Sequence, residues 1–344
     1  MPVKVRLYNE DDRRKWEGFV DGSVNSALYH RIRWKDVVEK TFGHKTYYLL
    51  AEDQGGIAGI LPLVHLKSVC FGSFMVSLPY FNYGGICAET PEAREGLLKA
   101  AIGIGTEKKV KHMELRHTID LDLGLPAKSA KVSMLLALPS SKEALWDSFP
   151  SKLRSQIKKP EKEKMQARTG RLEELDGFYR VFSMNMRDLG TPVYSRAFFK
   201  NILESFPEST WICTVYMGGE PVASGFLAGF KNTLEIPWAS STRQYNKYSP
   251  NMLLYWSALK FAVEKGYSTF DFGRSTPGEG TFKFKEQWGA KPVKLFWHYW
   301  VRDGGPVPEI NPKNPRYNAV INIWKRLPLS VTKLLGPGIV KNIP

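Results

Sequence analysis

Two stretches of the sequence share one layout: "YYLLAEDQGGIAGILPLVHL" at residues 47–66 and "WICTVYMGGEPVASGFLAGF" at residues 211–230. Each is typical of a β-hairpin, because strand-forming residues flank a Gly-Gly pair that suits a tight turn. A hairpin that occurs twice in this way indicates an internal repeat, and the segments that follow decide what kind of repeat it is.

Each hairpin continues with a further strand, an amphipathic helix and a closing strand with a basic residue at its end. These three segments are residues 74–86, 91–108 and 111–117 in the first copy and residues 233–241, 250–265 and 268–275 in the second. Strands mixed with helices in the same order predict an α/β (α+β) protein built from a duplicated unit. On pattern alone, two unrelated hairpin-and-helix regions are the alternative.

The boundary between the copies is predicted after residue 139, because a helix start at residues 140–143 opens the second unit. Further helices are expected from near Ser151 and over residues 172–188. The predicted organisation is a first unit over residues 1–139, a second unit over residues 140–303 and a tail over residues 304–344.

The tail is basic and amphipathic. It contains six Lys or Arg residues and no Asp or Glu between residues 311 and 344, with a helical apolar pattern after Pro315. Such a segment either packs against the body of the protein or lies on an anionic membrane surface through residues 316–344.

The chain of 344 residues carries a net charge of +15, and the excess is unevenly distributed. Residues 151–171 hold eight Lys or Arg against two Glu. An imbalance of this kind favours anionic partners such as nucleic acid, phosphorylated substrates or anionic lipid. A basic, well-solvated surface is the alternative explanation.

Several classes of protein are disfavoured by what the sequence lacks. The three cysteines are widely spaced, so they predict neither a disulfide framework nor a metal site, and no bound cofactor is expected. No apolar run reaches the roughly 18 residues of a spanning helix, and residues 1–16 show no apolar signal segment. These features predict a cytoplasmic protein, at most peripheral at the inner face of the membrane. The sequence also has no nucleotide P-loop, no dinucleotide fingerprint, no G-x-S-x-G elbow and no H-E-x-x-H motif.

The candidate site lies in the second unit, around "FDFGRSTPGEGTFKFKEQWGA" at residues 270–290. Upstream of this stretch, Ser249 is a suitable N-cap and Pro250 a suitable first residue for a helix. The free backbone N–H groups at this helix start are expected to face the open end of the sheet, where they would hold a phosphate or a carboxylate.

Downstream, Phe and Lys alternate in "TFKFKEQW", which predicts a strand that turns both lysines to one face. Arg274, Lys283 and Lys285 are then expected to converge on an anionic group or a developing oxyanion. An ordinary capped helix and an edge strand with a solvated lysine face are the alternative interpretations.

Five stretches together carry a family resemblance. They are "SLPYFNYGG" (77–85), "SKLRSQIKKPEKEKM" (151–165), "SPNMLLYWSALKFAVEKGYSTFDFGRS" (249–275), "GTFKFKEQWGA" (280–290) and "WKRLPLSVTKLLGPGIVKNIP" (324–344). Their order resembles the FemAB family, the aminoacyl-tRNA-dependent transferases that build peptidoglycan cross-bridges. More narrowly, the last three stretches are similar to the FemAB-related proteins that accompany PEP-CTERM/exosortase and exopolysaccharide systems. The resemblance, which includes FemX-like members, implies two tandem GNAT-like units, each a mixed, mostly antiparallel sheet flanked by helices.

The resemblance also implies a reaction in which an amine attacks an activated acyl carbon and forms an amide. The donor would be aminoacyl-tRNA, and the acceptor an amine of a cell-envelope precursor of peptidoglycan or exopolysaccharide. In this family a lysine of a Phe-Lys pair before the final glycine turn lies in the active site, and the pair here is Phe284-Lys285. Lys285 would stabilise negative charge on the acyl oxygen or the leaving ribose oxygen, with Arg274 as a further catalytic candidate. Asp271, or the substrate itself, would remove the proton of the amine.

Other residues are candidate substrate contacts. Arg154, Lys158 and Lys159 match the basic helix of the family and would contact phosphates. Asn82 and Tyr83 are expected where a strand of the first unit meets the cleft between the units. The remaining candidates are Trp238, Tyr248, Ser249, Asn251 and Lys283.

Two further readings stay open. In one, the donor is acyl-CoA or an acyl carrier protein, although "NKYSPN" at residues 246–251 stands where acetyl-CoA-binding GNAT enzymes carry a glycine-rich loop. In the other, the protein is a non-enzymatic accessory protein that binds RNA or a membrane.

Overall fold

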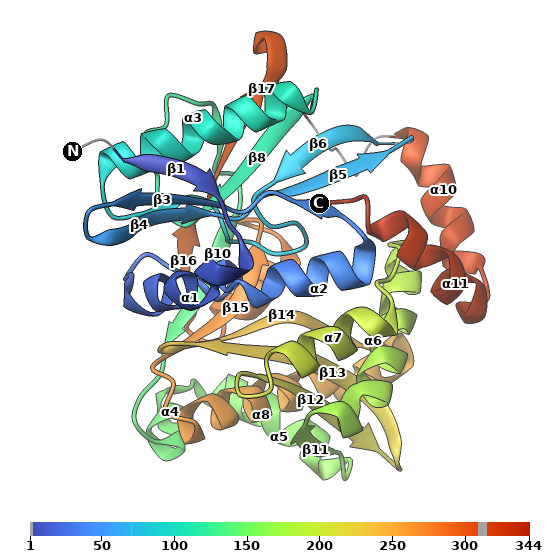
Figure 1. Ribbon diagram of the computed structural model, residues 1–344. Helices are drawn as coiled ribbons and strands as arrows, with labels where there is room; N and C mark the ends of the chain where they lie inside the picture. The colour runs from blue at the N-terminus through green and yellow to red at the C-terminus, as the bar shows by residue number, and fades with distance from the viewer. Residues whose placement is uncertain (1–2, 70, 309–314) are drawn as a thin grey trace. The chain divides into compact units, whose positions relative to one another are not determined.

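The computed structural model describes residues 3–69, 71–308 and 315–344, with the side chains of residues 315–318 left aside (Figure 1). Its contacts divide the chain into two compact units. Unit 1 consists of residues 1–131, 294–310 and 341–344, and unit 2 consists of residues 132–293 and 311–340. Each unit therefore combines segments that are distant in the sequence.

Unit 1 is built on two sheets. Its strands are β1 (Lys4–Leu7), β2 (Lys45–Thr46), β3 (Leu49–Asp53), β4 (Gly56–Leu61), β5 (Val64–Ser68), β6 (Gly72–Val76), β7 (Cys87–Ala88), β8 (His112–His117), β9 (Ala127–Lys128) and β17 (Phe296–Val301), and its helices are α1 (Arg13–Gly22), α2 (Arg33–Phe42) and α3 (Pro91–Glu107). The four-stranded sheet has the order β1-β3-β4-β7, and the six-stranded sheet has the order β2-β5-β6-β8-β17-β9. α3 packs against β1, β3 and β4 and contributes Leu97 and Ala101 to a buried apolar core shared with both sheets.

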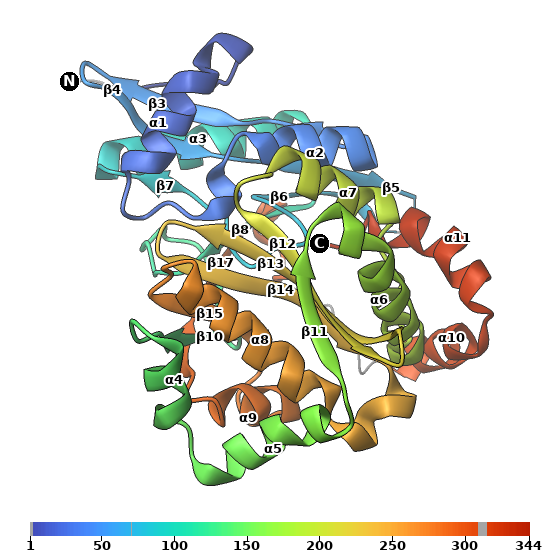
Figure 2. The ribbon, with the colours of Figure 1, turned by 90° about the horizontal axis from the view of Figure 1, so that it is seen from below.

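Unit 2 is built on one seven-stranded sheet with the order β11-β12-β13-β14-β15-β10-β16. Its strands are β10 (Val132–Ala137), β11 (Gln166–Gly170), β12 (Thr210–Met217), β13 (Glu220–Phe230), β14 (Thr233–Ser241), β15 (Thr269–Ser275) and β16 (Lys291–Lys294), and its helices are α4 (Lys142–Ser148), α5 (Ser151–Lys162), α6 (Leu175–Leu189), α7 (Arg196–Ser205), α8 (Pro250–Glu264), α9 (Gly280–Glu286), α10 (Pro315–Arg326) and α11 (Leu329–Val340). α4, α5 and α8 cover one face of the sheet, and α6 and α7 cover the other (Figure 1 and Figure 2).

The repeat predicted from the two hairpins is confirmed. β3 pairs with β4 and β12 pairs with β13, both antiparallel, and in each unit a helix then leads to a closing strand. The closing strands β8 and β15 run parallel to β6 and β14 respectively, whereas their remaining neighbours are antiparallel. The fold is therefore α/β with mixed, mostly antiparallel sheets flanked by helices, as expected.

The two repeats exchange a strand each. β10 follows the first repeat in the sequence but pairs with β15 of the second, and β17 follows the second repeat but pairs with β8 of the first. For this reason the contacts divide the chain after Lys131, upstream of the boundary expected after residue 139, and residues 294–310 join unit 1.

The segment expected to form a strand after residue 280 is a helix, so that part of the sequence analysis is wrong. α9 covers "GTFKFKE", and its Phe284 ring lies edge-on to Tyr255 of α8, 5.0 Å between centroids, and 6.3 Å from Trp288. Trp288, just after the end of α9, is part of the apolar core of unit 2, and Phe284 packs against that core. Helical spacing also turns Lys283 and Lys285 to different sides.

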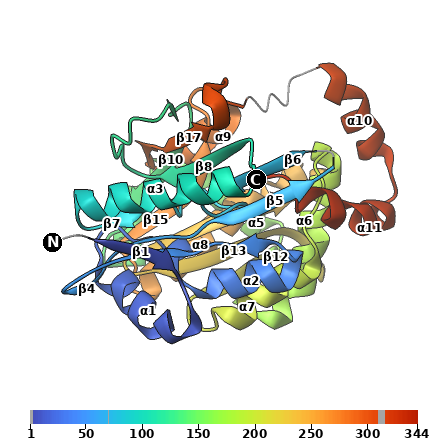
Figure 3. The same ribbon diagram turned by 45° about the horizontal axis from the view of Figure 1, so that its top comes forward.

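The tail packs against unit 2. α10 and α11 follow each other at the end of the chain, and both contact α6 (Figure 3). Trp324 is buried, and the Cα of Gly336 lies so close to Val193 that a Cβ would stand 2.8 Å from the Val193 backbone nitrogen. Within the residues that the structure describes, no helix combines the length and apolar character needed to cross a bilayer.

We expect Trp324→Ala to lower the free energy of unfolding of unit 2 by about 3 kcal/mol, because it empties the site of a buried aromatic side chain on α10. Ile323→Ala, one residue earlier and exposed, is the matched control and is expected to change it by less than about 0.5 kcal/mol. Urea denaturation followed by circular dichroism measures both. Equal effects of the two substitutions would show that α10 does not pack as described.

Candidate functional site

The two parallel strands at the centre of unit 2 separate part-way along. β14 and β15 pair only over Thr233–Glu235 and Thr269–Asp271. β14 then continues beside β13 as far as Ser241, and β15 continues beside β10 as far as Ser275. The point of separation therefore lies at Glu235 and Asp271, and both of these acidic residues are buried.

A bulge in β15 follows directly after this point. The register between β10 and β15 shifts between Ser133 and Leu135, opposite the segment from Asp271 to Arg274. Gly273 within it has a φ of 74°, a left-handed conformation that favours glycine. Its N–H donates to Oδ1 of Asp271 at 2.7 Å, and the Ser133 hydroxyl donates to the same oxygen at 2.6 Å. Asp271 therefore fixes the backbone of the bulge, a device that commonly re-aims groups near active sites.

Lys285 completes this arrangement from α9. Its Nζ donates to the carbonyl oxygens of Gly273 at 2.9 Å and Arg274 at 3.0 Å, and the residue is only 8% exposed. These bonds use two of the three donors of the ammonium. Burial lowers the pKa of Lys285 to about 8, and the nearby carboxylates of Asp271 and Glu235 oppose that shift. The ammonium of Lys285 therefore loses its proton at a lower pH than that of an ordinary lysine.

The three basic residues expected to converge do not share one face. Lys285 is buried, whereas Arg274 and Lys283 are exposed. The cause is the helical conformation of α9, which separates residues two apart by roughly 200° around the helix axis. Lys285 is therefore the member of this set that the fold encloses, and it contacts Arg274 through that residue's backbone.

The start of α8 is also less open than expected. Ser249 does occupy the N-cap, but it has a left-handed conformation, and its side chain makes no capping hydrogen bond. The N–H of Met252 donates to the carbonyl of Ser249 at 2.9 Å, and Pro250 has no N–H. Few donors of the first turn remain for an anion.

The other candidates around α8 have differing surroundings. Trp238 packs edge-on against Phe199 of α7, 5.2 Å between centroids, within an aromatic cluster. The ammonium of Lys247 lies 4.8 Å from the centre of the Tyr248 ring. Asn251 is half-buried in the first turn of α8. The contacts of Trp238 are those of a residue that packs the protein interior.

The basic helix expected from Ser151 is α5. Its apolar side, which includes Leu153 and Ile157, is buried and packs toward α8. Lys158 and Lys159 are exposed. Arg154 is half-buried and lies 3.8 Å from the Asp147 carboxylate. α5 therefore presents a positive stripe to the solvent.

In unit 1 two parallel strands, β6 and β8, also separate part-way along, but different side chains lie at the point of separation. β6 and β8 pair through Met75–Val76, and Glu114 lies at the end of that pairing. The Arg116 guanidinium donates to Glu114 at 2.6 Å and stacks 4.3 Å from the Trp297 ring, while the Tyr299 hydroxyl donates to the second Glu114 oxygen at 2.7 Å. The corresponding position of unit 1 is therefore closed by an internal ion pair.

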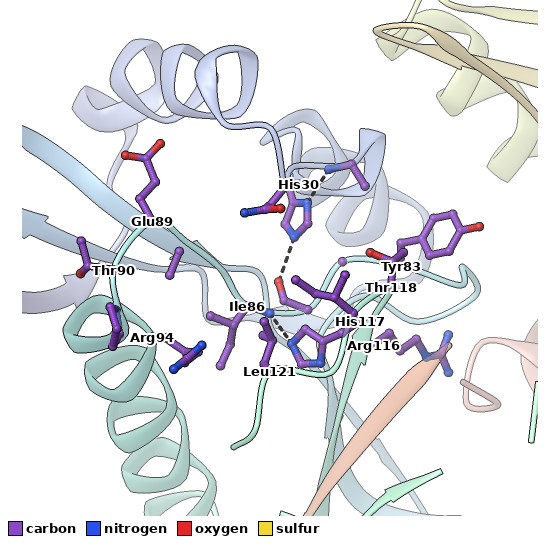
Figure 4. A pocket seen from close by; sticks show the side chains of 17 residues that line it. His30, Tyr83, Ile86, Glu89, Thr90, Arg94, Arg116, His117, Thr118 and Leu121 are labelled. Carbon is purple, nitrogen blue, oxygen red and sulfur yellow. Dashed lines mark hydrogen bonds between the residues drawn. The ribbon is translucent and has the colours of Figure 1, made fainter. Parts of the chain in front are cut away.

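A cavity of about 300 Å³ lies in unit 1 at the start of α3 (Figure 4). Tyr83, one of the predicted binding residues, lines it, and Asn82 is not among its lining residues. Thr90, the N-cap of α3, and Arg94 form part of its wall. Arg94 is half-buried and brings a positive charge to the wall of the cavity, which suits an anionic ligand.

Buried histidines beside this cavity are functional candidates that the sequence reasoning missed. Nδ1 of His30 accepts from the Ala27 N–H, so Nε2 donates to the Gly85 carbonyl at 2.9 Å. Nε2 of His117 accepts from the Ile86 N–H at 2.9 Å, which leaves its Nδ1 to donate toward His298 at 3.0 Å. Burial, with His298 close by, lowers the pKa of His117 well below its ordinary value.

These histidines lie far apart in the sequence. Only His117 could have been identified from it, because this residue ends the closing strand of the first repeat. Gly85 marks the same place, because a Cβ there would stand 2.3 Å from the His117 ring. Among the residues that the structure describes, no group of three or more His, Cys, Asp or Glu side chains is arranged to hold a metal ion.

Comparison with known proteins identifies a GNAT domain within unit 2. Residues 148–286, which run from the end of α4 through α9, match the family model described as an acetyltransferase (GNAT) domain. The match indicates transferase activity. It includes both Asp271 and Lys285. No curated protein sequence matches the chain.

Solved structures share the fold over nearly the whole chain. The crystal structure of FemX is similar with a TM-score of 0.65 and 15% identity, covering 86% of this chain and 96% of that one. The structure of L-PGS from Bacillus licheniformis gives 0.56 and 15%, covering 96% and 99%. A tandem GNAT protein from the clavulanic acid biosynthesis pathway gives 0.56 and 9%, covering 89% and 100%. The fold is thus that of tandem GNAT proteins.

Lys285 is expected to titrate near pH 8 in the folded protein and near 10.5, the ordinary lysine value, after denaturation. Asp271→Asn removes an anion that favours the ammonium, so it should lower the pKa of Lys285 further. Carbon-13 shifts of labelled lysine side chains, followed against pH, measure both effects. Lys283→Ala is the control, since that exposed residue is not among the groups acting on Lys285. A midpoint near 10.5 in the folded protein would contradict the enclosure described here.

Proposed function

We propose that the chain is an N-acyltransferase of the FemAB type. It transfers an aminoacyl group from aminoacyl-tRNA to an amine of a cell-envelope precursor, of peptidoglycan or of an exopolysaccharide. The observation that carries the proposal is the enclosed ammonium of Lys285 at the point where β14 and β15 separate, inside the segment that matches a GNAT domain.

The reaction requires a cation more than it requires a base. The acceptor amine attacks the ester carbonyl of the aminoacyl-tRNA, the C–N bond forms, and the bond to the ribose oxygen breaks. The amine proton passes to the solvent or to the leaving ribose oxygen, so the products are an amide and free tRNA. Negative charge develops on the carbonyl oxygen and then on the ribose oxygen, and the Lys285 ammonium would stabilise it.

Asp271 is better suited to hold Lys285 than to take the proton. Its Oδ1 already accepts from Ser133 and from the Gly273 N–H, and the residue is buried. It fixes the carbonyl of Gly273, to which Lys285 donates. We therefore assign Asp271 as a positioning residue and leave the proton of the amine to the substrate or the solvent.

The remaining charged surfaces suit the two substrates. The exposed Lys158 and Lys159 of α5 would contact the phosphates of tRNA, for which a basic helix is a common binding element. In unit 1, the cavity beside Tyr83 and Arg94 would take an anionic group of the acceptor. Both assignments rest on charge and access.

Acyl-CoA is the second candidate donor, and the description of the matching family as an acetyltransferase domain favours it. The start of α8 argues against it, because Pro250 lacks an N–H and Met252 already donates to Ser249. A pyrophosphate normally binds to several such free N–H groups. A thermal-shift experiment compares CoA thioesters with charged tRNA. If only the CoA thioesters stabilise the protein, acyl-CoA becomes the preferred donor.

Lys285→Ala is expected to lower amide formation by about 100-fold or more, as loss of an oxyanion donor typically does. The assay incubates the protein with charged tRNA and amino-sugar or lipid-linked precursors and detects the amide by mass spectrometry. Lys283→Ala, on the same helix but exposed, is the matched control and should retain activity.

Because Lys285 also holds the bulge, its loss could act through folding alone, so the wild-type pH profile provides a second measure. If the ammonium is required, kcat/KM should fall about tenfold per pH unit above pH 8, as Lys285 loses its proton. A rate that stays level or rises through this range would rule out the assigned role.

Lys158→Glu with Lys159→Glu is expected to weaken tRNA binding and to reduce the slope of log affinity against log salt by about two, one for each lost phosphate contact. Filter binding over a series of salt concentrations measures this slope. The double substitution Lys108→Glu with Lys109→Glu in unit 1 is the control of equal charge change. Identical slopes for the two variants would remove α5 from the tRNA site.

A further inference from the structure

The last two helices of the chain, α10 and α11, combine a buried side with an exposed apolar side. We call them the C-terminal helix pair. Trp324, Thr332 and Gly336 are buried, and the Lys333 ammonium lies 5.2 Å from the centre of the Tyr179 ring of α6. These contacts fix which side of each helix faces unit 2.

Both helices also carry large apolar residues that are in contact with solvent. Their exposed fractions are 62% for Val320, 63% for Ile323, 79% for Leu334 and 49% for Leu335. Val320 and Ile323 are three residues apart and lie on one face of α10. Leu334 and Leu335 are consecutive on α11. Single exposed apolar residues are ordinary on a protein surface, whereas two helices in sequence that each expose a pair mark an interaction surface.

The charge of the same segment is of one sign. Residues 311–344 include six Lys or Arg and no Asp or Glu. Lys325 and Arg326 are exposed at the end of α10, next to the turn that leads to α11. Long basic side chains beside exposed aliphatic ones are typical of helices that lie in the interface of an anionic bilayer.

RNA would be the other anionic partner, and the exposed residues argue against it. Sites for single-stranded RNA add aromatic rings for base stacking to their basic groups. Here the aromatic residue of the pair with a described side chain, Trp324, is buried against unit 2, and the solvent side offers aliphatic residues. Lipid acyl chains match that chemistry.

We propose that the C-terminal helix pair binds the surface of an anionic lipid bilayer. Val320, Ile323, Leu334 and Leu335 enter the boundary between headgroups and acyl chains. Arg326, three residues after Ile323, contacts anionic headgroups beside it, and the long side chain of the exposed Lys325 extends to them from the flank of α10. The pair lies flat on the bilayer and does not cross it. This binding is independent of the transfer reaction, and it would hold the protein at the surface where lipid-linked precursors lie.

The test is co-sedimentation of the full chain with two kinds of vesicle. One kind is phosphatidylcholine alone, and the other is phosphatidylcholine and phosphatidylglycerol in equal parts. We expect binding to the anionic vesicles that weakens with added salt, and at most a trace on the neutral ones. The quadruple variant V320S/I323S/L334S/L335S should bind at least tenfold more weakly, since it removes the inserted apolar area. K325E/R326E should lose about 25-fold or more, because each basic residue near the surface contributes about fivefold.

A control variant distinguishes binding through this surface from non-specific binding of exposed apolar residues. Leu7→Ser with Val24→Ser removes apolar residues of similar exposure, 51% and 90%, from unit 1 and should leave vesicle binding unchanged. All substituted residues are exposed, so circular dichroism should show unaltered folding for every variant.

Three results would overturn the proposal. One is equal binding to both kinds of vesicle or to neither. Another is loss of binding to uncharged tRNA in the two helix-pair variants, with vesicle binding unaffected, which would assign the surface to RNA. The third is a dimer of the wild-type chain that V320S/I323S/L334S/L335S converts to a monomer while vesicle binding persists, which would assign the surface to a second copy of the chain.

Discussion

The separation of β14 from β15 is the constraint on which the chemistry of unit 2 depends. Two strands that part within a sheet leave backbone groups without their ladder partners, and buried backbone groups must be satisfied. In this structure a bulge at Gly273 absorbs the change of register, Asp271 accepts the freed N–H, and Lys285 donates to the freed carbonyls. The backbone carbonyls of Gly273 and Arg274 need a hydrogen-bond donor, and the buried ammonium of Lys285 supplies it. These two hydrogen bonds also fix the position of the ammonium.

The two units show two solutions to one topological problem. In unit 1 the position is filled by Arg116, which comes from the same strand as its partner Glu114 and is covered by Trp297. That pair is complete, because both charges and most donors are used internally. In unit 2 the cation comes from a separate helix, and only two of its three donors are used. The match to the GNAT domain model, at residues 148–286, falls on the unit in which the cation is not closed by an ion pair on its own strand.

Local patterns predicted the repeated elements, because a hairpin or a capped helix is determined by residues close in sequence. The β12–β13 hairpin and the helices α3 and α8 lie where alternation, Gly-Gly pairs and helix signals placed them. The strand exchange of β10 and β17 was not predictable, because the pairing partner of a strand is chosen over distances that no local pattern records. α9 was misread for a related reason. Phe and Lys at alternate positions satisfy a strand pattern, and only the packing of Phe284 on Tyr255 decides for a helix.

For the candidate site, the sequence identified the residue but not the arrangement of the groups around it. Lys285 was singled out through a family resemblance, and the structure encloses it, yet the cluster with Lys283 and Arg274 depended on the wrong secondary structure. What the sequence could not supply was the environment of the lysine, which follows from burial and from Asp271 and Glu235 around it. That environment also explains why lysine rather than arginine suits this position. A guanidinium stays charged at any pH that a protein experiences. Burial disfavours the Lys285 ammonium and lowers its pKa to about 8, so a negative charge that develops beside it offsets part of that desolvation cost.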